Sequence, residues 1–485
     1  KPLLEKKNSE TAVEYTVFGQ SHLDLAWLWP WEETKRKSAR TYANQLALME
    51  RYPEYQFLLC EPPILENLKE YYPGLYQKVK ERVETGQFVP EGAVYIESDT
   101  NLAGGESLIR QFVLGKRSYR QELKVDSRMA WMPDTFGFTG ALPQIMAGCG
   151  VPFFATQKLL RADPECQQFP YNIFWWEGID GTRILSHIYK KNNAVFTPGA
   201  LIERWEKDRN QRENIDSLMF PFGYGDGGGG PTELMVETAL RCRDLEGLPR
   251  CRMESPGAFF ERISKFPVSN VYYGELYLAW HRGTYTSQAR IKRGVRRAEY
   301  ALREAEYLAG VLRLSPKAAR ERDLDAEARK KLEELWKKLL FQEFHDILPG
   351  TSIQRVNREA VEALKQVEQE SRHLAEKILE RLAGGRAVFN SLSWERSWKG
   401  SVLPACGYVK LRDDDWSVGD EGQRSDSQGA SGKVSWWENF DGKGSLRIQN
   451  SFYIAEMDQE GRIFSLKDCR TEYEYAREPL NRWRL

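Results

Sequence analysis

Five short segments of the chain combine histidine or aspartate with aromatic residues or glycine, and these residues could carry out chemistry. The first contains His22 and Asp24 directly after the apolar run 15–18. In an extended segment, side chains two residues apart point to the same side, so an imidazole nitrogen and a carboxylate oxygen converge. Such a pair suits zinc or another divalent metal. A structural hydrogen-bonded pair would give the same pattern.

The second segment, Trp-Met-Pro-Asp-Thr-Phe-Gly-Phe at 131–138, follows another apolar run. Its aspartate, Asp134, stands between a proline and aromatic residues. Apolar walls remove water from a carboxylate, and sugar rings stack on aromatic faces. Asp134 is therefore a candidate functional group, and a helix N-cap is the alternative for an aspartate in this place.

The third segment places Tyr224 and Asp226 just before four consecutive glycines at 227–230. No Gly-Lys-Ser or Gly-Lys-Thr follows, which excludes a P-loop. Glycine lets the backbone approach a ligand closely, and Asp226 would project into the same space. A plain flexible loop is the alternative.

The fourth and fifth segments, at 279–287 and 343–352, each contain a histidine among polar and aromatic residues. His281 stands in the fourth. His345 and Asp346 stand in the fifth, at the expected end of a helix and before a Pro-Gly turn. Three of the five histidines of the chain therefore lie in these segments. The other two stand in ordinary strand and helix contexts and are expected to be structural: His187 and His373.

The elements that position these residues alternate between strands and helices up to about residue 270. Buried strands are expected at 15–18, 56–59, 128–132, 153–155, 184–189 and 218–222, and amphipathic helices at, for example, 106–123 and 232–243. This alternation predicts an α/β domain with a largely parallel, barrel-like sheet. In such sheets the chemistry lies beyond the carboxyl ends of the strands, where the polar motifs stand.

The remainder of the chain changes character twice. Apolar residues at three- and four-residue spacing predict a three-helix bundle with helices at 286–313, 324–345 and 353–382. After two glycines, β-like runs at 387–389, 401–403, 445–448 and 463–466, with a polar loop at 413–432, predict the start of an all-β domain. The expected domains are an α/β catalytic domain at 1–275, the bundle at 276–385 and a partial β-sandwich at 386–485.

Composition limits which binding partners and which cellular compartment are expected. The 485 residues include 70 basic and 70 acidic ones, so net charge gives no argument for nucleic acid or an anionic membrane. No run of 18 apolar residues is present, so no membrane span is expected. Seven scattered cysteines without a Cys-x-x-Cys pair argue against a disulfide framework and a thiolate zinc site, and favour the cytoplasm. Assembly into a homo-oligomer stays open.

Taken together, the five motifs resemble glycoside hydrolase family 38, the class II α-mannosidases. The resemblance rests on His-x-Asp-x-x-Trp, Pro-Asp-x-Phe-Gly, Gly-Asp-Gly-Gly-Gly-Gly-Pro, His-x-Gly-Thr-Tyr-Thr-Ser and His-Asp before Pro-Gly-Thr. The glycine run resembles the cytosolic, vacuolar and prokaryotic branch. The resemblance extends over about residues 12–400. Members of the family continue for several hundred residues more, so the chain is expected to be truncated at its C-terminal end.

The resemblance implies a retaining α-mannosidase that removes terminal α-linked mannose from oligosaccharides or glycans with one zinc ion. The implied metal ligands are His22, Asp24, Asp134 and His345. Asp134 is the implied nucleophile, and it would form a covalent glycosyl-enzyme. Asp226 is the expected acid/base. The Golgi branch has two adjacent acids in this loop, whereas a glycine follows Asp226 here, so Asp346 stays the other candidate.

The resemblance also implies residues that contact the sugar. These are Trp27 and Phe136 as an aromatic wall, Asp346 as a binder of sugar hydroxyls, and Tyr224, His281 and Lys158 as further hydroxyl contacts. Two other functions compete with the hydrolase. One is a metal-dependent polysaccharide deacetylase, which would form no covalent adduct on Asp134, and the other is a non-catalytic mannose-binding fragment.

Overall fold

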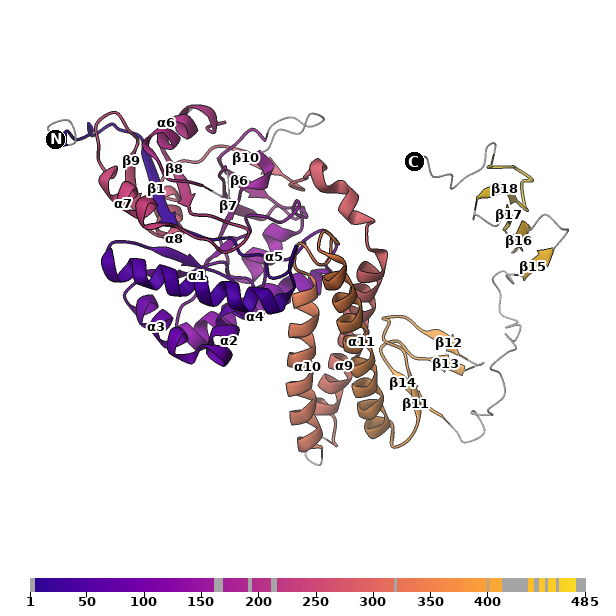
Figure 1. The fold of residues 1–485 in the computed structure, drawn as a ribbon. Coiled ribbons are helices and arrows are strands. Elements are labelled where there is room, and N and C mark those ends of the chain that lie inside the picture. Colours follow the sequence, from indigo (N-terminus) through magenta and orange to yellow (C-terminus); the bar gives the residue numbers. More distant parts are fainter. Residues whose placement is uncertain are drawn as a thin grey trace. The chain divides into compact units, whose positions relative to one another are not determined.

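The computed structural model describes residues 5–160, 169–190, 194–210, 216–317, 321–398, 401–411, 435–439, 445–449, 452–458 and 462–476. The chain divides into two compact units, Lys1–Lys410 and Leu411–Leu485 (Figure 1). Each unit is described by itself. The predicted polar loop at 413–432 lies outside the described residues.

The first unit contains two five-stranded sheets. One has the order β3-β2-β1-β8, with β9 also paired to β1, and all its pairs are parallel. Its strands are β1 Glu14–Gly19, β2 Phe57–Leu59, β3 Phe88–Pro90, β8 Ser217–Phe222 and β9 Arg250–Met253. Strand β1 pairs with β8 along its whole length, from Glu14 opposite Ser217 to Gly19 opposite Phe222.

The other sheet has the order β10-β6-β7-β5-β4, and only β6 and β7 are antiparallel within it. Its strands are β4 Met129–Trp131, β5 Phe153–Thr156, β6 Ile173–Glu177, β7 Arg183–Ile188 and β10 Val271–Tyr273. The predicted α/β class with a largely parallel sheet is confirmed, and all six predicted strands are present. Four strands of the two sheets were not predicted, namely β3, β6, β9 and β10. All but β6 are only three or four residues long, which gives little periodic signal.

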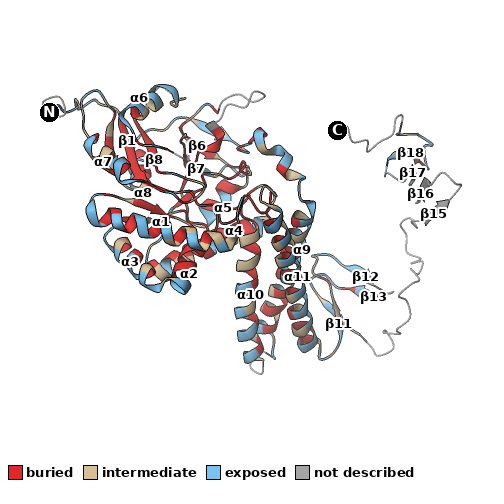
Figure 2. Ribbon diagram, viewed as in Figure 1, coloured by how far each residue is buried: buried red, intermediate tan, exposed pale blue. Residues whose placement is uncertain are grey.

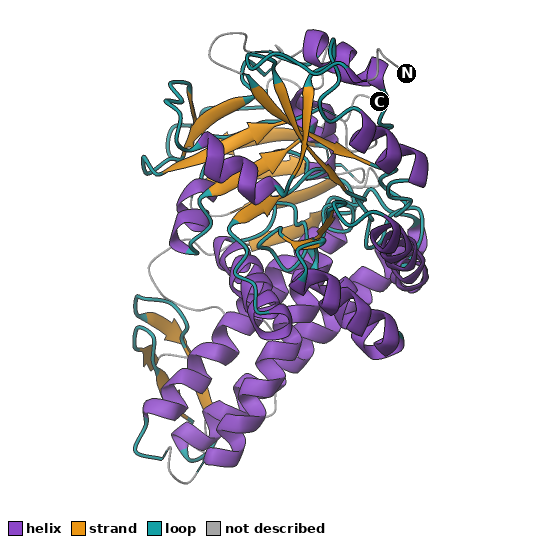
Figure 3. Ribbon diagram, turned by 90° about the vertical axis from the view of Figure 1, so that its left-hand side faces the viewer, coloured by secondary structure: helices purple, strands orange, loops and turns teal. Residues whose placement is uncertain are grey.

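Helices flank these strands (Figure 3). They are α1 Trp31–Arg51, α2 Pro62–Tyr71, α3 Pro73–Glu84, α4 Gly105–Leu123, α5 Leu142–Gly148, α6 Pro198–Lys207, α7 Glu233–Arg241 and α8 Pro256–Ile263. Proline opens α2, α3, α6 and α8, where its fixed φ suits the first turn. The side chains of Thr197, Thr232 and Ser255 accept backbone N–H groups at three helix starts, which satisfies otherwise unpaired donors.

Burial follows from this layered arrangement. All six residues of β1 and of β8 are buried, because helices cover the sheet on its outside (Figure 2). Continuous apolar runs such as these are typical of parallel strands that are covered on both faces. The packed core therefore fixes the carboxyl ends of these strands. The polar segments that follow the strands are positioned by those ends.

A bundle of three long helices follows, namely α9 Ala289–Leu314, α10 Arg322–Gln342 and α11 Gln354–Ala383. The predicted bundle is confirmed. The prediction that the second helix reaches residue 345 is wrong, because α10 ends at Gln342. Phe344 instead forms an antiparallel bridge with Ser98, and a helical backbone cannot make this contact. His345 and Asp346 therefore lie in a turn beyond the helix.

Short antiparallel strands follow the bundle. In the first unit, β11 Ala387–Phe389 pairs with β14 Tyr408–Lys410, and β12 Arg396–Trp398 pairs with β13 Ser401–Leu403. The second unit has a four-stranded antiparallel sheet of β15 Ser435–Asn439, β16 Ser445–Gln449, β17 Tyr453–Met457 and β18 Ile463–Asp468. The predicted β-rich end is confirmed, and the exact domain boundaries stay predictions. Among the described helices, none is both long and apolar enough to span a membrane.

One helical glycine makes a close contact that the fold requires. A Cβ added to Gly115 in α4 would stand 2.3 Å from the carbonyl carbon of Val94 and 2.6 Å from the nitrogen of Tyr95. Since both atoms are backbone, Gly115→Ala is expected to lower the free energy of unfolding by about 1–3 kcal/mol. Thermal and denaturant unfolding would measure this loss.

The matched control is Gly310→Ala in α9, where an added Cβ meets nothing within 4 Å. This change is expected to raise stability by up to about 1 kcal/mol, because alanine favours a helix. Equal effects of the two substitutions would contradict the close packing of α4.

Candidate metal and catalytic site

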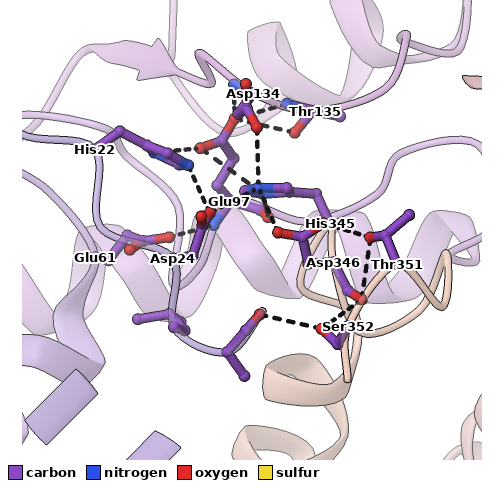
Figure 4. A network of polar contacts seen from close by, with 12 residues as sticks. His22, Asp24, Glu61, Glu97, Asp134, Thr135, His345, Asp346, Thr351 and Ser352 are labelled. Carbon is purple, nitrogen blue, oxygen red and sulfur yellow. Dashed lines mark hydrogen bonds and ion pairs between the residues drawn. The ribbon is translucent and has the colours of Figure 1, made fainter. Parts of the chain in front are cut away.

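The side chains of His22, Asp24, Asp134 and His345 form one cluster. One ligand atom from each lies within 4.8 Å of the others. Figure 4 shows the four side chains pointing toward one another. They follow β1, β4 and α10, so the cluster joins both sheets of the first unit to the helical bundle. The two strand-borne segments leave the carboxyl ends of parallel strands, where α/β folds gather their chemistry.

The distances within the cluster are short. His22 Nε2 lies 2.8 Å from Asp24 Oδ1, and His345 Nε2 lies 3.3 Å from the same oxygen. His345 Nε2 is also 3.7 Å from Asp134 Oδ2. The two imidazole rings are stacked, with centroids 5.3 Å apart. Two nitrogens and two carboxylates therefore face a common point.

The main chain at Asp24 is fixed on both sides. Its carbonyl oxygen accepts hydrogen bonds from the Thr34 hydroxyl at 3.0 Å and from the Trp29 indole at 3.2 Å. Its N–H donates to the carbonyl of Asp226 at 3.1 Å. The segment after β1 is therefore held by α1 on one side and by the glycine-rich loop on the other.

His345 supplies a test of whether the cluster fits a metal. Its side chain is fully buried, and Nδ1–H donates to the carbonyl of Glu97 at 3.1 Å. Nε2 has no hydrogen-bond partner among the described residues, although it faces two carboxylates. A buried polar atom is normally paired. A buried imidazole nitrogen turned toward two carboxylates is the arrangement that a metal-ligating histidine needs, so these residues fit a divalent cation.

The charge of the site leads to the same conclusion. Burial alone would lower the pKa of His345, but Glu97, Asp24 and Asp346 raise it to about 9. Burial likewise opposes charge on His22, and the Asp24 carboxylate with its neighbours raises the pKa of this ring well above its usual value. The carboxylates thus favour positive charge on the two rings. A metal ion bound by neutral imidazoles would supply that charge in place of one proton on each ring.

Asp134 is held in its ionised form. Burial opposes the charge, but the Lys158 ammonium, 2.8 Å from Oδ2, and the two imidazoles lower the pKa of this carboxyl. Gln157 Nε2 donates to Oδ1 at 3.2 Å. Both residues follow β5, and Lys158 begins the short helix η2 Lys158–Leu160. Lys158, expected to contact a sugar hydroxyl, therefore contacts the candidate nucleophile itself.

The glycine-rich loop carries Asp226 to the same region. Leu23 and Gly227 form an antiparallel bridge, and Tyr224 and Gly230 form another, so the loop is a narrow ribbon against the segment after β1. Asp226 adopts a φ of 59°, which is unfavourable for a residue with a side chain. Burial, with a contribution from the Asp134 and Asp24 carboxylates, raises the pKa of Asp226. The environment thus favours the protonated form of Asp226 and the ionised form of Asp134.

The glycines were expected to let the backbone approach a ligand. The structure shows that most of them approach the protein itself. An added Cβ would stand 2.3 Å from the Gln20 carbonyl at Gly223, and 2.8 Å from the Thr41 hydroxyl at Gly228. At Gly227 the nearest atom would be 3.8 Å away, so this position faces more open space. Glycine is needed here mainly because the ribbon packs closely on its own supports.

Asp346 lies beside the cluster. Its Oδ2 is 3.8 Å from His345 Nε2, and its Oδ1 accepts a hydrogen bond from the Thr351 hydroxyl. Burial, reinforced by the Asp24 carboxylate, raises the pKa of Asp346 to about 7. Asp346 is therefore a second buried acid at the site.

The aromatic candidates differ in how accessible they are. Trp27 is half-buried, and Tyr224 is 44% exposed. Phe136 is only 4% exposed, because its ring lies 4.4 Å from the His281 ring and 4.2 Å from Lys158 Nζ. A sugar would have to displace these neighbours to stack on Phe136, whereas Trp27 and Tyr224 present free surface.

Glu97 is a central residue that motif reasoning missed. It is 2% exposed and follows β3. Its Oε1 accepts hydrogen bonds from the backbone N–H groups of Asp134 and Thr135, and its Oε2 lies 3.4 Å from His22 Nδ1. The available signal was a polar run at 97–101 directly after an apolar one, the same pattern that marked the other segments.

Glu61 is a second missed acid. It follows β2, and its Oε1 accepts the backbone N–H of Glu97 at 3.1 Å. Burial raises the pKa of Glu61 to about 7. Its signal was weaker, because it precedes two prolines and resembles an ordinary helix start.

Two protein-family models match the chain, one over the α/β part and one over the helical bundle. The family model "Glycosyl hydrolases family 38 N-terminal domain" matches residues 12–281, more than half of the chain. The chain belongs to glycosyl hydrolase family 38. The "Alpha mannosidase middle domain" model matches residues 279–382. The family 38 N-terminal match contains three of the clustered residues, and the middle-domain match contains His345.

Relatives within family 38 are similar over most of this chain. Alpha-mannosidase 2C1 of Homo sapiens is 38% identical over 387 residues, which cover 78% of this chain and 36% of that protein. Alpha-mannosidase G of Dictyostelium discoideum is 35% identical over 388 residues, which cover 79% of this chain and 35% of that protein. The chain thus spans about a third of the length of these relatives.

A solved alpha-mannosidase structure has the same fold. The alpha-mannosidase from Enterococcus faecalis V583 superimposes with a TM-score of 0.69 at 16% identity, covering 96% of this chain and 61% of that one. At this identity the likeness supports the architecture alone.

The cluster predicts metal-dependent stability. Zinc added to the metal-free protein at 100 times its dissociation constant is expected to stabilise it by about 2.7 kcal/mol, seen as a higher unfolding temperature. His345→Gln removes a ligand and is expected to weaken zinc by more than about 100-fold, since loss of an outer contact alone costs 10–100-fold. The control is His373→Gln, exposed on α11. Equal zinc responses of the two variants would refute the site.

Proposed function

We propose that this chain is the catalytic part of a zinc-dependent retaining α-mannosidase acting on oligosaccharides or glycans. One observation carries the proposal, namely that His22, Asp24, Asp134 and His345 offer ligand atoms within 4.8 Å of one another in a family 38 chain. Two named alpha-mannosidases at 38% and 35% identity support the substrate class.

The donor set favours zinc as the metal. Two imidazole nitrogens and two carboxylates are ordinary zinc ligands, and no described cysteine is among them. When bound, the ion supplies a template that orients the vicinal hydroxyls of mannose and helps to distort its ring. The family resemblance implies that this template selects mannose by its axial 2-hydroxyl.

Asp134 is the proposed nucleophile. Its ionised carboxylate attacks the anomeric carbon, a carbon–oxygen bond forms, and the bond to the leaving oxygen breaks. Lys158 and Gln157 orient the carboxylate, since each contacts one of its oxygens. Backbone hydrogen bonds from Asp134 and Thr135 to Glu97 hold the peptide behind it. Few orientations are then available to the attacking group.

Asp226 is the proposed acid/base. Its raised pKa favours the protonated form that delivers a proton to the leaving oxygen. In the second step the same group accepts a proton from water, which attacks the anomeric carbon and releases Asp134. Two inversions give net retention, for which the two carboxyls must stand roughly 5–5.5 Å apart during the reaction.

Substrate contacts complete the proposal. Asp346 is a buried acid beside the cluster and would bind sugar hydroxyls, and Trp27 would offer an aromatic face. Tyr224 and His281 remain proposed hydroxyl contacts. Phe136 and Lys158 act mainly by packing against His281 and Asp134. Family membership does not favour a deacetylase, and a non-catalytic binder is one outcome of the tests below.

Asp134→Asn is expected to lower kcat/KM for an aryl α-mannoside by at least about 10³-fold, because the nucleophile is lost. In the unmodified chain, NMR should show α-mannose as the first-formed product, and a fluorinated mannosyl fluoride should label Asp134, as located by mass spectrometry. Asp323→Asn in the exposed first turn of α10 is the control. Zinc binding without turnover in the unmodified chain would favour the binder instead.

Asp226→Asn is expected to slow hydrolysis of a phenyl α-mannoside by about 10²–10⁴-fold, because proton donation is lost. A dinitrophenyl leaving group departs without a proton, so this variant should show a burst of dinitrophenol followed by slow turnover. Asp346→Asn is the matched comparison and should raise KM for both substrates alike. If Asp346→Asn slowed the phenyl substrate more than the dinitrophenyl one, and Asp226→Asn did not, Asp346 would be the acid/base and Asp226 the binder of sugar hydroxyls.

A further inference from the structure

Glu97 contacts three of the four residues that form the metal cluster. Its Oε2 faces His22, its Oε1 faces the backbone of Asp134, and its carbonyl oxygen faces His345 (Figure 4). At 2% exposure it lies behind the cluster, out of reach of a sugar.

The first contact is with the His22 ring. Glu97 Oε2 stands 3.4 Å from His22 Nδ1, while His22 Nε2 is hydrogen-bonded to Asp24 Oδ1 at 2.8 Å. Carboxylate oxygens accept hydrogen bonds, so each ring nitrogen faces an acceptor. A metal bound at Nε2 would take the place of the proton there, and Nδ1–H would stay directed at Glu97.

The second contact does the same for His345. The carbonyl oxygen of Glu97 accepts Nδ1–H of this ring at 3.1 Å, and it also accepts the His345 backbone N–H at 3.1 Å. Nδ1 thus carries the proton here too, and the unpaired Nε2 faces the carboxylates. One residue orients both imidazoles through two different groups.

The third contact fixes Asp134. Glu97 Oε1 accepts the backbone N–H groups of Asp134 and Thr135, the latter at 2.8 Å. The turn after β4 is thereby tied to the same side chain that orients the rings. A shift of Glu97 would move all three ligands together.

Glu97 is itself held in place from beneath. Glu61 Oε1 accepts its backbone N–H at 3.1 Å. Glu61 has a φ of 65°, an unfavourable conformation for a residue other than glycine, which persists only where the surroundings determine it. The support is therefore built into the turn between β2 and α2.

We propose that Glu97 is a positioning residue that sets the tautomer of His22 and His345 and the placement of Asp134, and so determines metal affinity. This inference rests on the proposed metal site. It adds a residue that would touch neither metal nor sugar. Outer partners of metal-bound histidines commonly change metal affinity by 10–100-fold.

Glu97→Gln is a sharp test, because glutamine has the same size and neither orientation of its amide suits the site. With the amide oxygen toward Asp134 and Thr135, the NH₂ group donates to His22 Nδ1 and moves the ring proton to Nε2, where the metal would bind. With the amide reversed, the NH₂ group meets two backbone N–H donors. Both orientations lose an interaction that glutamate makes.

The experiment measures zinc dissociation constants of the full chain by chelator competition. Glu97→Gln is expected to bind zinc 10–100-fold more weakly than the unmodified chain. The control is Glu91→Gln, another largely buried carboxylate, which accepts the Ser127 hydroxyl and the backbone N–H groups of Arg128 and Met129 at the opposite end of β4. Glu91→Gln should bind zinc as the unmodified chain does.

The outcomes separate the inference from the proposed function. Equal zinc affinity of Glu97→Gln and the unmodified chain would overturn the role of Glu97 and leave the metal site standing. Failure of the unmodified chain to bind zinc would overturn the metal site and this inference with it. If Glu97→Gln does not fold, NMR of the zinc-bound unmodified chain decides, since His22 and His345 should each show a protected Nδ1–H proton. Protons on Nε2 instead would overturn the inference.

Discussion

The accumulation of buried negative charge is the constraint on which the rest of the site depends. Asp24, Glu97 and Asp346 are each less than 5% exposed, and the Asp134 carboxylate lies 3.7 Å from His345 Nε2 in the same cluster. Carboxylates so close together and out of water repel one another and are costly unless positive charge is present. Two imidazoles and Lys158 supply part of that charge. A divalent cation bound by the neutral rings would take over the charge of the two imidazoles, which links metal binding directly to the stability of this part of the fold.

Such a concentration of charge is tolerable only on a rigid support. The central strands β1 and β8 are buried throughout and end at the site. The bundle contributes equally, because the turn after α10 carries His345 and Asp346. Lys292 of α9 donates to the carbonyls of Leu348 and Pro349 and so fixes this turn from outside. Burial lowers the pKa of Lys292 to about 8. The bundle is therefore part of the structure that positions the candidate site.

The glycine-rich loop shows how the support continues to the side chains expected to react. Gly223 and Gly228 allow the ribbon to lie directly on Gln20 and Thr41, and the carbonyl of Asp226 binds the N–H of Asp24. The acid/base candidate and a candidate metal ligand thus share one hydrogen bond. The left-handed φ of 59° at Asp226 is maintained by these contacts.

The sequence by itself determined the architecture and most of the chemistry. Long apolar runs and helical periodicity depend on local composition, so the strands around β1 and the three-helix bundle were predictable. The five motifs contain His22, Asp24, Asp134, Asp226 and His345. Only the tertiary structure decided which of these groups meet, that Phe136 is covered, and that α10 ends before His345. The tertiary structure also decided the importance of Glu97 and Glu61, which comes from contacts with residues far away in the sequence. A local pattern such as the polar run at 97–101 marks a segment, but which of its side chains meets the cluster depends on where separate strands end in the fold.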